Sequence, residues 1–175
     1  MPNNDEKLSK KLSHAYEQFV HTLKTFVDVT EKEAEPALKD AIDKTKDKMA
    51  EITELTGEEI DHVSDYVMRD IKDAAQYIAY GERELSDWLR LDTLYLEDRF
   101  MEAFSKMVDY TKAALNDIEN EAFLASEWHT GEIASPGTLV CEKCGELIHF
   151  EKTGHVPPCP KCHNTVFVRE SEIEK

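Results

Sequence analysis

The first 140 residues contain no cysteine, although the chain has four. The sequence also lacks an apolar stretch long enough to form the core of a secretory signal peptide or to cross a bilayer. We therefore expect a soluble, cytoplasmic protein with no membrane partner. In that reducing compartment, closely spaced pairs of cysteines indicate metal binding before they indicate disulfides.

Basic residues are scarce: the chain has 21 Lys and Arg against 37 Asp and Glu, a formal net charge of −16. The imbalance is concentrated in residues 1–130, because residues 131–175 carry 5 basic and 7 acidic groups. A strongly negative surface repels the phosphates of nucleic acids and anionic lipids. We expect no nucleic-acid binding by residues 1–130 and at most weak binding by the C-terminal part.

Glycine and proline are nearly missing from the N-terminal part of the chain. Neither occurs in residues 82–130, and only Pro36 interrupts residues 7–55. Apolar residues at spacings of three and four predict a body of amphipathic helices over residues 1–130, with helices at about 6–29, 35–55, 57–80 and 82–128. At 1.5 Å per residue the last helix would be roughly 70 Å long. We therefore expect extended, antiparallel, coiled-coil-like packing.

The stretch LTGEEI marks the boundary between the second and third predicted helices. Thr56 can accept a hydrogen bond from a backbone N–H of the first turn, and Glu59 can reach back to the N–H of Thr56. Leu55 and Ile60 flank this capping box as a hydrophobic staple. The third helix is therefore predicted to begin at residue 57.

No catalytic arrangement stands out in the helical part. The sequence has no HExxH pair, nucleophile elbow, P-loop or dinucleotide loop. His14, His21 and His62 are scattered over predicted helices and form no metal-binding pattern with carboxylates. We expect this protein not to be an enzyme.

All four cysteines lie in one segment, CEKCGELIHFEKTGHVPPCPKC, at residues 141–162. Two CxxC pairs separated by fourteen residues can present four sulfurs to one ion, and Zn²⁺ prefers a tetrahedron of such ligands at about 2.3 Å. The predicted ligands are Cys141, Cys144, Cys159 and Cys162. With four thiolates the coordination shell is full, which predicts one structural zinc rather than a catalytic one.

Residues around the cysteines alternate in the manner of short strands. TLV, ELIHFEK and NTVFVRE predict three strands, so residues 131–170 form a β zinc ribbon, and residues 171–175 are a flexible tail. A module of roughly 40 residues buries too little apolar surface to fold alone, and the metal supplies the missing stability. We expect the helical body to stay folded without metal.

Two alternatives remain for the metal site. Tetrahedral thiolate sites also suit iron, which would make the chain a rubredoxin-like electron carrier. His149, His155 and His163 could in principle bind a metal, but with four cysteines available we expect them to be ordinary strand and loop residues.

The C-terminal segment resembles the zinc-ribbon tail of the YbeL-like family of bacterial proteins. The motifs that carry the resemblance are HTGE at residues 129–132, LVCEKC at 139–144 and CPKC at 159–162. Upstream, LTGEEIDHVSDYVMRD corresponds to a helical segment of the family that ends in Arg69 and Asp70. The resemblance implies a helical region followed by a ribbon with zinc on the four cysteines, and it implies no particular activity. His163 stands where the family usually has glycine, and histidine tolerates the left-handed backbone of such a position.

The leading hypothesis is a non-catalytic adaptor or regulatory protein, whose helical body oligomerises or docks on a protein and whose ribbon is a recognition tip. The seam around Phe100, Phe104 and Met107 is the candidate surface for self-association. The alternatives are a rubredoxin-like iron redox or zinc-sensing protein, and a ribbon that binds nucleic acid weakly. The basic residues for that last role are Lys143, Lys152, Lys161 and Arg169, and glutamates are interleaved with them.

Overall fold

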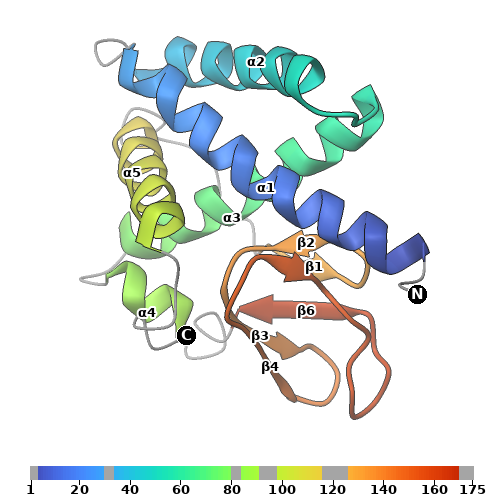
Figure 1. Cartoon of the computed structure of the whole chain (residues 1–175). Helices are drawn as coiled ribbons and strands as arrows, with labels where there is room; N and C mark the ends of the chain where they lie inside the picture. Colours follow the sequence, from blue (N-terminus) through green and yellow to red (C-terminus); the bar gives the residue numbers. More distant parts are fainter. Residues whose placement is uncertain (1–3, 30–33, 80–83, 91–97, 116–125, 170–175) are drawn as a thin grey trace.

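A computed structural model describes residues 4–29, 34–79, 84–90, 98–115 and 126–169 (Figure 1). It contains helices α1 (Asn4–Val29), α2 (Ala34–Ile52), α3 (Gly57–Ala79), α4 (Leu85–Leu89) and α5 (Asp98–Leu115). Six strands follow: β1 (Trp128–His129), β2 (Ile133–Ala134), β3 (Gly137–Cys141), β4 (Leu147–Phe150), β5 (Gly154–His155) and β6 (Val166–Arg169). The expectation of a mainly helical chain that ends in a small antiparallel β zinc ribbon is confirmed.

The helices bury the apolar stripes that the sequence spacing predicts. Helix α1 crosses the body diagonally and contacts α2, α3 and α5 (Figure 1). The shared core includes Phe19, Leu23, Met49, Val63, Val67, Ile71, Phe104 and Met107. Phe100, Phe104 and Met107 are at most 2% exposed, so these three side chains of the predicted seam are covered within the chain itself.

The junction between α2 and α3 has the predicted chemistry. The Glu59 N–H donates to Thr56 Oγ1 at 3.1 Å, and the Thr56 N–H donates to Glu59 Oε2 at 2.8 Å. Leu55 and Ile60 on either side are both buried in the helical core. The capping box therefore starts α3 at residue 57 as predicted, whereas α2 ends at Ile52 and not at residue 55.

The prediction of one helix over residues 82–128 is wrong. Helix α4 is five residues long and ends at Arg90, whose backbone is left-handed with φ 52° and ψ 35°. Trp88 and Leu89 turn into the core, and the Arg90 carbonyl accepts a hydrogen bond from the Thr138 hydroxyl at 3.0 Å. The predicted helix is therefore interrupted at Arg90, so the length argument for an extended coiled coil no longer holds. Residues 98–115 of the predicted helix form α5, and residues 82–83, 91–97 and 116–125 lie outside the described residues.

The ribbon is a four-stranded antiparallel sheet in the order β1-β6-β3-β4, with a second, two-stranded sheet of β2 and β5. The three predicted strands are present as β3, β4 and β6. Strands β1, β2 and β5 are two residues each and have no recognisable alternation in the sequence. In Figure 1 the small β2–β5 sheet lies between the ribbon and α1. No helix among the described residues is long and apolar enough to cross a membrane.

Candidate metal centre

Two similar turns carry the cysteines. In the first turn, the Gly145 N–H donates to the Cys141 carbonyl at 2.9 Å, and the Cys141 N–H donates to the Glu146 carbonyl at 2.8 Å. In the second, the His163 N–H donates to the Cys159 carbonyl at 2.9 Å, and the Cys159 N–H donates to the carbonyl of Asn164 at 2.9 Å. The two cysteine turns therefore have the same pattern of backbone hydrogen bonds.

Each turn closes with a residue in a left-handed conformation. Gly145 has φ 78° in the first turn, and His163 has φ 63° at the equivalent position of the second. Glycine adopts this conformation without strain, and histidine is one of the few other residues found there. The second turn thus keeps the shape of the first although it lacks a glycine.

The four sulfurs form one compact cluster. All four Sγ atoms lie within 4.8 Å of one another, with Cys141 and Cys162 at 3.5 Å and Cys144 and Cys159 at 3.6 Å. A tetrahedron with metal–sulfur bonds of about 2.3 Å has edges of about 3.8 Å. The sulfurs are too far apart for a disulfide, whose S–S length is about 2.0 Å. The donor set fits one tetrahedral metal ion.

Backbone N–H groups favour the thiolate form of Cys141 and Cys159, whereas at Cys144 the lowering effect of the Glu146 N–H is outweighed by burial and the neighbouring thiols, which raise the pKa to about 12. Burial by itself raises the pKa of the Cys141 thiol, but N–H groups of Cys144 and Lys143 that donate to the sulfur lower that pKa to about 6. Burial also raises the pKa of Cys159, and the N–H groups of Cys162 and Lys161 lower it below its usual value. Both changes favour the thiolate, which is the form that binds metals.

Asn164 is a neighbour of the centre that the sequence pattern did not single out. Its Nδ2 lies 3.7 Å from the Cys141 sulfur and donates to the Val166 carbonyl at 3.0 Å. The amide therefore connects a sulfur to the first residue of β6. No spacing rule indicates this role.

The histidines lie outside the sulfur cluster. Among the described residues, the one group of three or more metal-binding side chains is that of the four cysteines. His155 and His163 are exposed, and His149 contacts Thr138 Oγ1 through Nδ1 at 2.9 Å. The Thr138 hydroxyl donates to the Arg90 carbonyl, so the His149 Nδ1–H is the donor in this pair.

One of the four basic residues considered for nucleic-acid binding is not at the surface. Arg169 is 0% exposed and therefore cannot reach a phosphate. Lys161 lies 3.9 Å from the Glu146 carboxylate, and Lys143 and Lys152 are exposed among glutamates. The predicted patch is thus smaller than the sequence indicated, and it is balanced by acidic groups.

Comparison with known proteins agrees with this architecture. The model of a family described as a zinc-ribbon containing domain matches residues 4–171. The "Uncharacterized protein YbeL" of Escherichia coli strain K12 is 25% identical over 132 residues, which cover 73% of this chain and 79% of the relative. The protein of the same name from E. coli O157:H7 matches to the same extent. No solved structure matches the chain. The chain belongs to this zinc-ribbon family.

Proposed function

We propose that this member of the zinc-ribbon family is a non-catalytic adaptor, which holds one structural zinc ion and presents the end of its ribbon to a protein partner. The observation that carries the proposal is the set of four sulfurs within 4.8 Å of one another. Four thiolates fill a tetrahedral shell, and a catalytic zinc keeps one position open for water or substrate.

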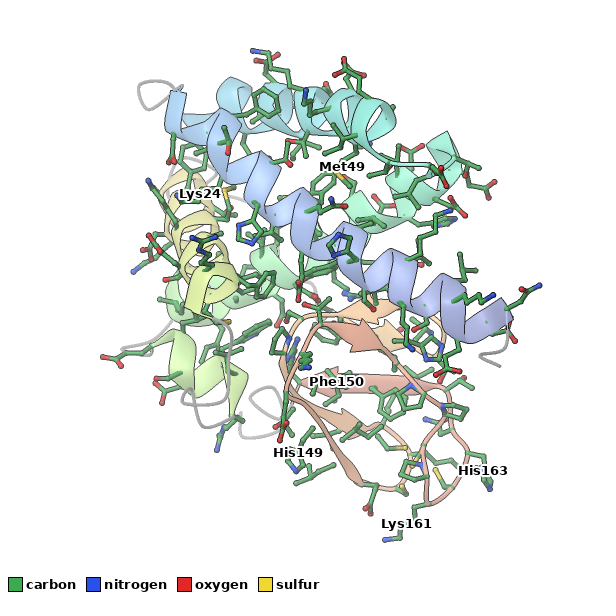
Figure 2. All side chains as sticks on the ribbon, in the orientation of Figure 1. Lys24, Met49, His149, Phe150, Lys161 and His163 are labelled. Atoms are coloured by element: carbon green, nitrogen blue, oxygen red, sulfur yellow. The ribbon has the colours of Figure 1, made fainter. Side chains whose placement is uncertain are left out.

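The position of the cysteine turns supports a role in recognition. Both turns lie at the end of the ribbon that faces away from the helices, and Figure 2 shows Lys161 and His163 there with their side chains pointing outward. Lys143, Pro160, Lys161 and His163 are all exposed. A metal fixes the backbone of such turns, so their side chains form a surface that loses little conformational entropy when it binds a partner.

The identity of the metal is tested first, because iron is the alternative. The full-length protein, purified without added metal, should contain about one zinc per chain by mass spectrometry and should show no visible absorption. A red protein with iron–thiolate bands would reject the structural-zinc proposal and favour the redox alternative. Loss of zinc on replacing any one cysteine with serine would confirm the ligand set.

The adaptor role is tested with a variant of the tip. Lys161→Ala combined with His163→Asn removes two exposed side chains, and asparagine also tolerates the left-handed backbone at 163. The control combines Lys44→Ala with His62→Asn on exposed helical positions. Partners that bind wild type and the control, but not the tip variant at equal zinc content, would support the proposal. Equal recovery of every partner by all three proteins would refute recognition by the tip.

A further inference from the structure

A buried carboxylate joins the helical body to the ribbon. Asp70 on α3 is 0% exposed and accepts four hydrogen bonds. Two donors come from the body, the Tyr16 hydroxyl at 2.6 Å and Arg69 Nε at 3.0 Å. The other two come from the ribbon, Trp128 Nε1 at 2.7 Å and the Ser135 N–H at 2.9 Å. Each of the two parts thus supplies half of the hydrogen bonds that this carboxylate accepts.

A buried guanidinium makes a second connection at the same place. Arg169 is the last residue of β6. Its Cζ lies 4.0 Å from the ring centre of Trp88 and 4.9 Å from that of Trp128. Its Nη2 donates to Ser135 Oγ at 2.9 Å. Trp88 Nε1 in turn donates to the Asp73 carboxylate at 2.8 Å. Both tryptophans of the chain therefore contact this guanidinium, one from α4 and one from β1.

The same ribbon residues pack against the metal ligands. Trp128 shares a buried cluster with Cys141, Cys159 and Phe167, and Phe167 pairs with both Trp128 and Cys141 in the sheet. The indole thus belongs to the core around the sulfurs, while its Nε1–H donates to the carboxylate of Asp70.

A second path runs through the β2–β5 sheet. Glu132 Oε1 accepts a hydrogen bond from Arg69 Nη1 at 3.1 Å, and the Glu132 carbonyl accepts one from the Val156 N–H at 2.9 Å. Val156 lies three residues before Cys159, and Ile133 is buried in the helical core. The segment that leads into the second cysteine turn is therefore connected to α3 through Glu132.

We propose that metal loading of the ribbon is coupled to the packing of α1 and α3, so that loss of the metal opens the junction around Asp70. The inference rests on the proposed function in that it requires the cysteines to hold a metal. Metal binding to such a small module is largely folding free energy, so an empty ribbon loses its structure. Asp70 then loses two of its four donors, and a buried carboxylate with too few partners destabilises the helices around it.

Under this coupling, the conformation of the helical body depends on whether the ribbon holds a metal ion. The body is expected to be closed when the ribbon is loaded and to open around α1 and α3 when it is empty. This behaviour differs from the expectation, drawn from sequence, that the body stays folded without metal. By thermodynamic reciprocity, weakening the junction from the helical side must also weaken metal binding.

The first test removes metal from the full-length wild-type protein with a chelator and follows hydrogen exchange by mass spectrometry. We expect amides of α1 around Tyr16 and of α3 around Asp70 to exchange at least about tenfold faster after metal removal. Tryptophan emission should shift to the red in the same titration, because the reporters Trp88 and Trp128 are both fully buried. Loss of protection in residues 137–169 alone, with α1 and α3 unchanged, would overturn the proposal.

The second test approaches the junction from the helical side. Asp70→Asn keeps the shape of the side chain and removes its charge, and Asp65→Asn makes the same change at an exposed position of the same helix. We expect Asp70→Asn to raise the dissociation constant for zinc, measured by competition with a chromophoric chelator, by about tenfold. Asp65→Asn should leave it unchanged.

The possible outcomes separate this proposal from the one on which it rests. Equal zinc affinity in wild type and both variants would refute the coupling while leaving the zinc site intact. A chain that binds no metal would refute the proposed function itself. If Asp70→Asn does not fold even with zinc, the exchange experiment on wild type still decides.

Discussion

Replacing Gly137 with alanine tests the packing of the junction most directly. Gly137 is the first residue of β3 and has φ 139°, a conformation that residues with a Cβ rarely adopt. A Cβ at this position would overlap Nη1 of Arg169 and lie 3.2 Å from the Leu89 carbonyl. Long side chains usually move away from such a clash. Arg169 cannot do so cheaply, because it is fully buried against two indole rings.

Two other glycines allow the two costs to be separated. Gly131 has φ 98°, and a Cβ there would meet no atom within 4 Å, so Gly131→Ala tests backbone strain alone, at about 1 kcal/mol. Gly57 has neither a left-handed backbone nor a neighbouring atom that a Cβ would meet. Gly57→Ala should therefore change the unfolding free energy by at most about 0.5 kcal/mol. Gly137→Ala adds overpacking of about 2 kcal/mol to the strain, about 3 kcal/mol in total. For a chain of this size, that lowers the melting temperature by about 9 °C.

The assay is urea unfolding of the three variants with saturating zinc, followed by circular dichroism and by tryptophan emission. The order of destabilisation should be Gly137→Ala, then Gly131→Ala, then Gly57→Ala. In folded Gly137→Ala, the emission should already differ from wild type, because Arg169 has moved against the two indoles. Equal destabilisation by Gly137→Ala and Gly131→Ala, with native emission in both, would show that the guanidinium is not confined as described.

Three further predictions concern the cap, the metal and the buried tyrosine. Thr56→Ala should cost about 1 kcal/mol of unfolding free energy, because the Glu59 N–H loses its acceptor; an unchanged urea midpoint would count against the cap. Cys159→Ser should release the metal, as measured by mass spectrometry, and retention of a full equivalent would mean that three sulfurs suffice. Burial and the charge of Asp70 raise the pKa of Tyr16 well above its usual value. In the unfolded chain a tyrosine ionises near pH 10, so this tyrosine should leave the unfolding free energy unaffected below about pH 10 and lower it above that pH. Tyr16→Phe should lack that fall in a urea titration at each pH.

Local rules were sufficient for the metal turns and the helix junction. The spacing of the cysteines indicated the ligand set, and the fold brings these four side chains together. The capping box at Thr56 and the left-handed backbone of His163 also follow from short-range chemistry, because each depends on residues within a few positions. Such features need no knowledge of the tertiary structure.

The break after α4 and the two-residue strands depend on distant partners. Arg90 ends a helix where Thr138, 48 residues later, binds its carbonyl. Strands β1 and β2 exist because β6 and β5 pair with them, and two residues are too few to show an alternating pattern. Helical periodicity alone therefore continues the helix and omits these strands.

The sequence contains only a weak indication that Asp70 and Arg169 are buried at the junction. Asp70 follows Val67 by three positions and precedes Ala74 by four, so it lies on the buried stripe of α3 rather than on its acidic face. Arg169 follows Phe167 by two positions, which places both on the inward face of β6. In a chain with 37 acidic residues, one carboxylate on the apolar stripe does not stand out.

The chemistry of the junction explains how the ribbon keeps one orientation on the body. An apolar interface tolerates small shifts, because contact between hydrocarbon groups is not directional. The carboxylate of Asp70 accepts from four fixed directions, and the guanidinium of Arg169 is confined by two rings. A displaced ribbon would leave both charges buried without partners, which costs far more than lost apolar contact. Buried charge is a poor source of stability, but here it excludes alternative placements of the metal-binding tip.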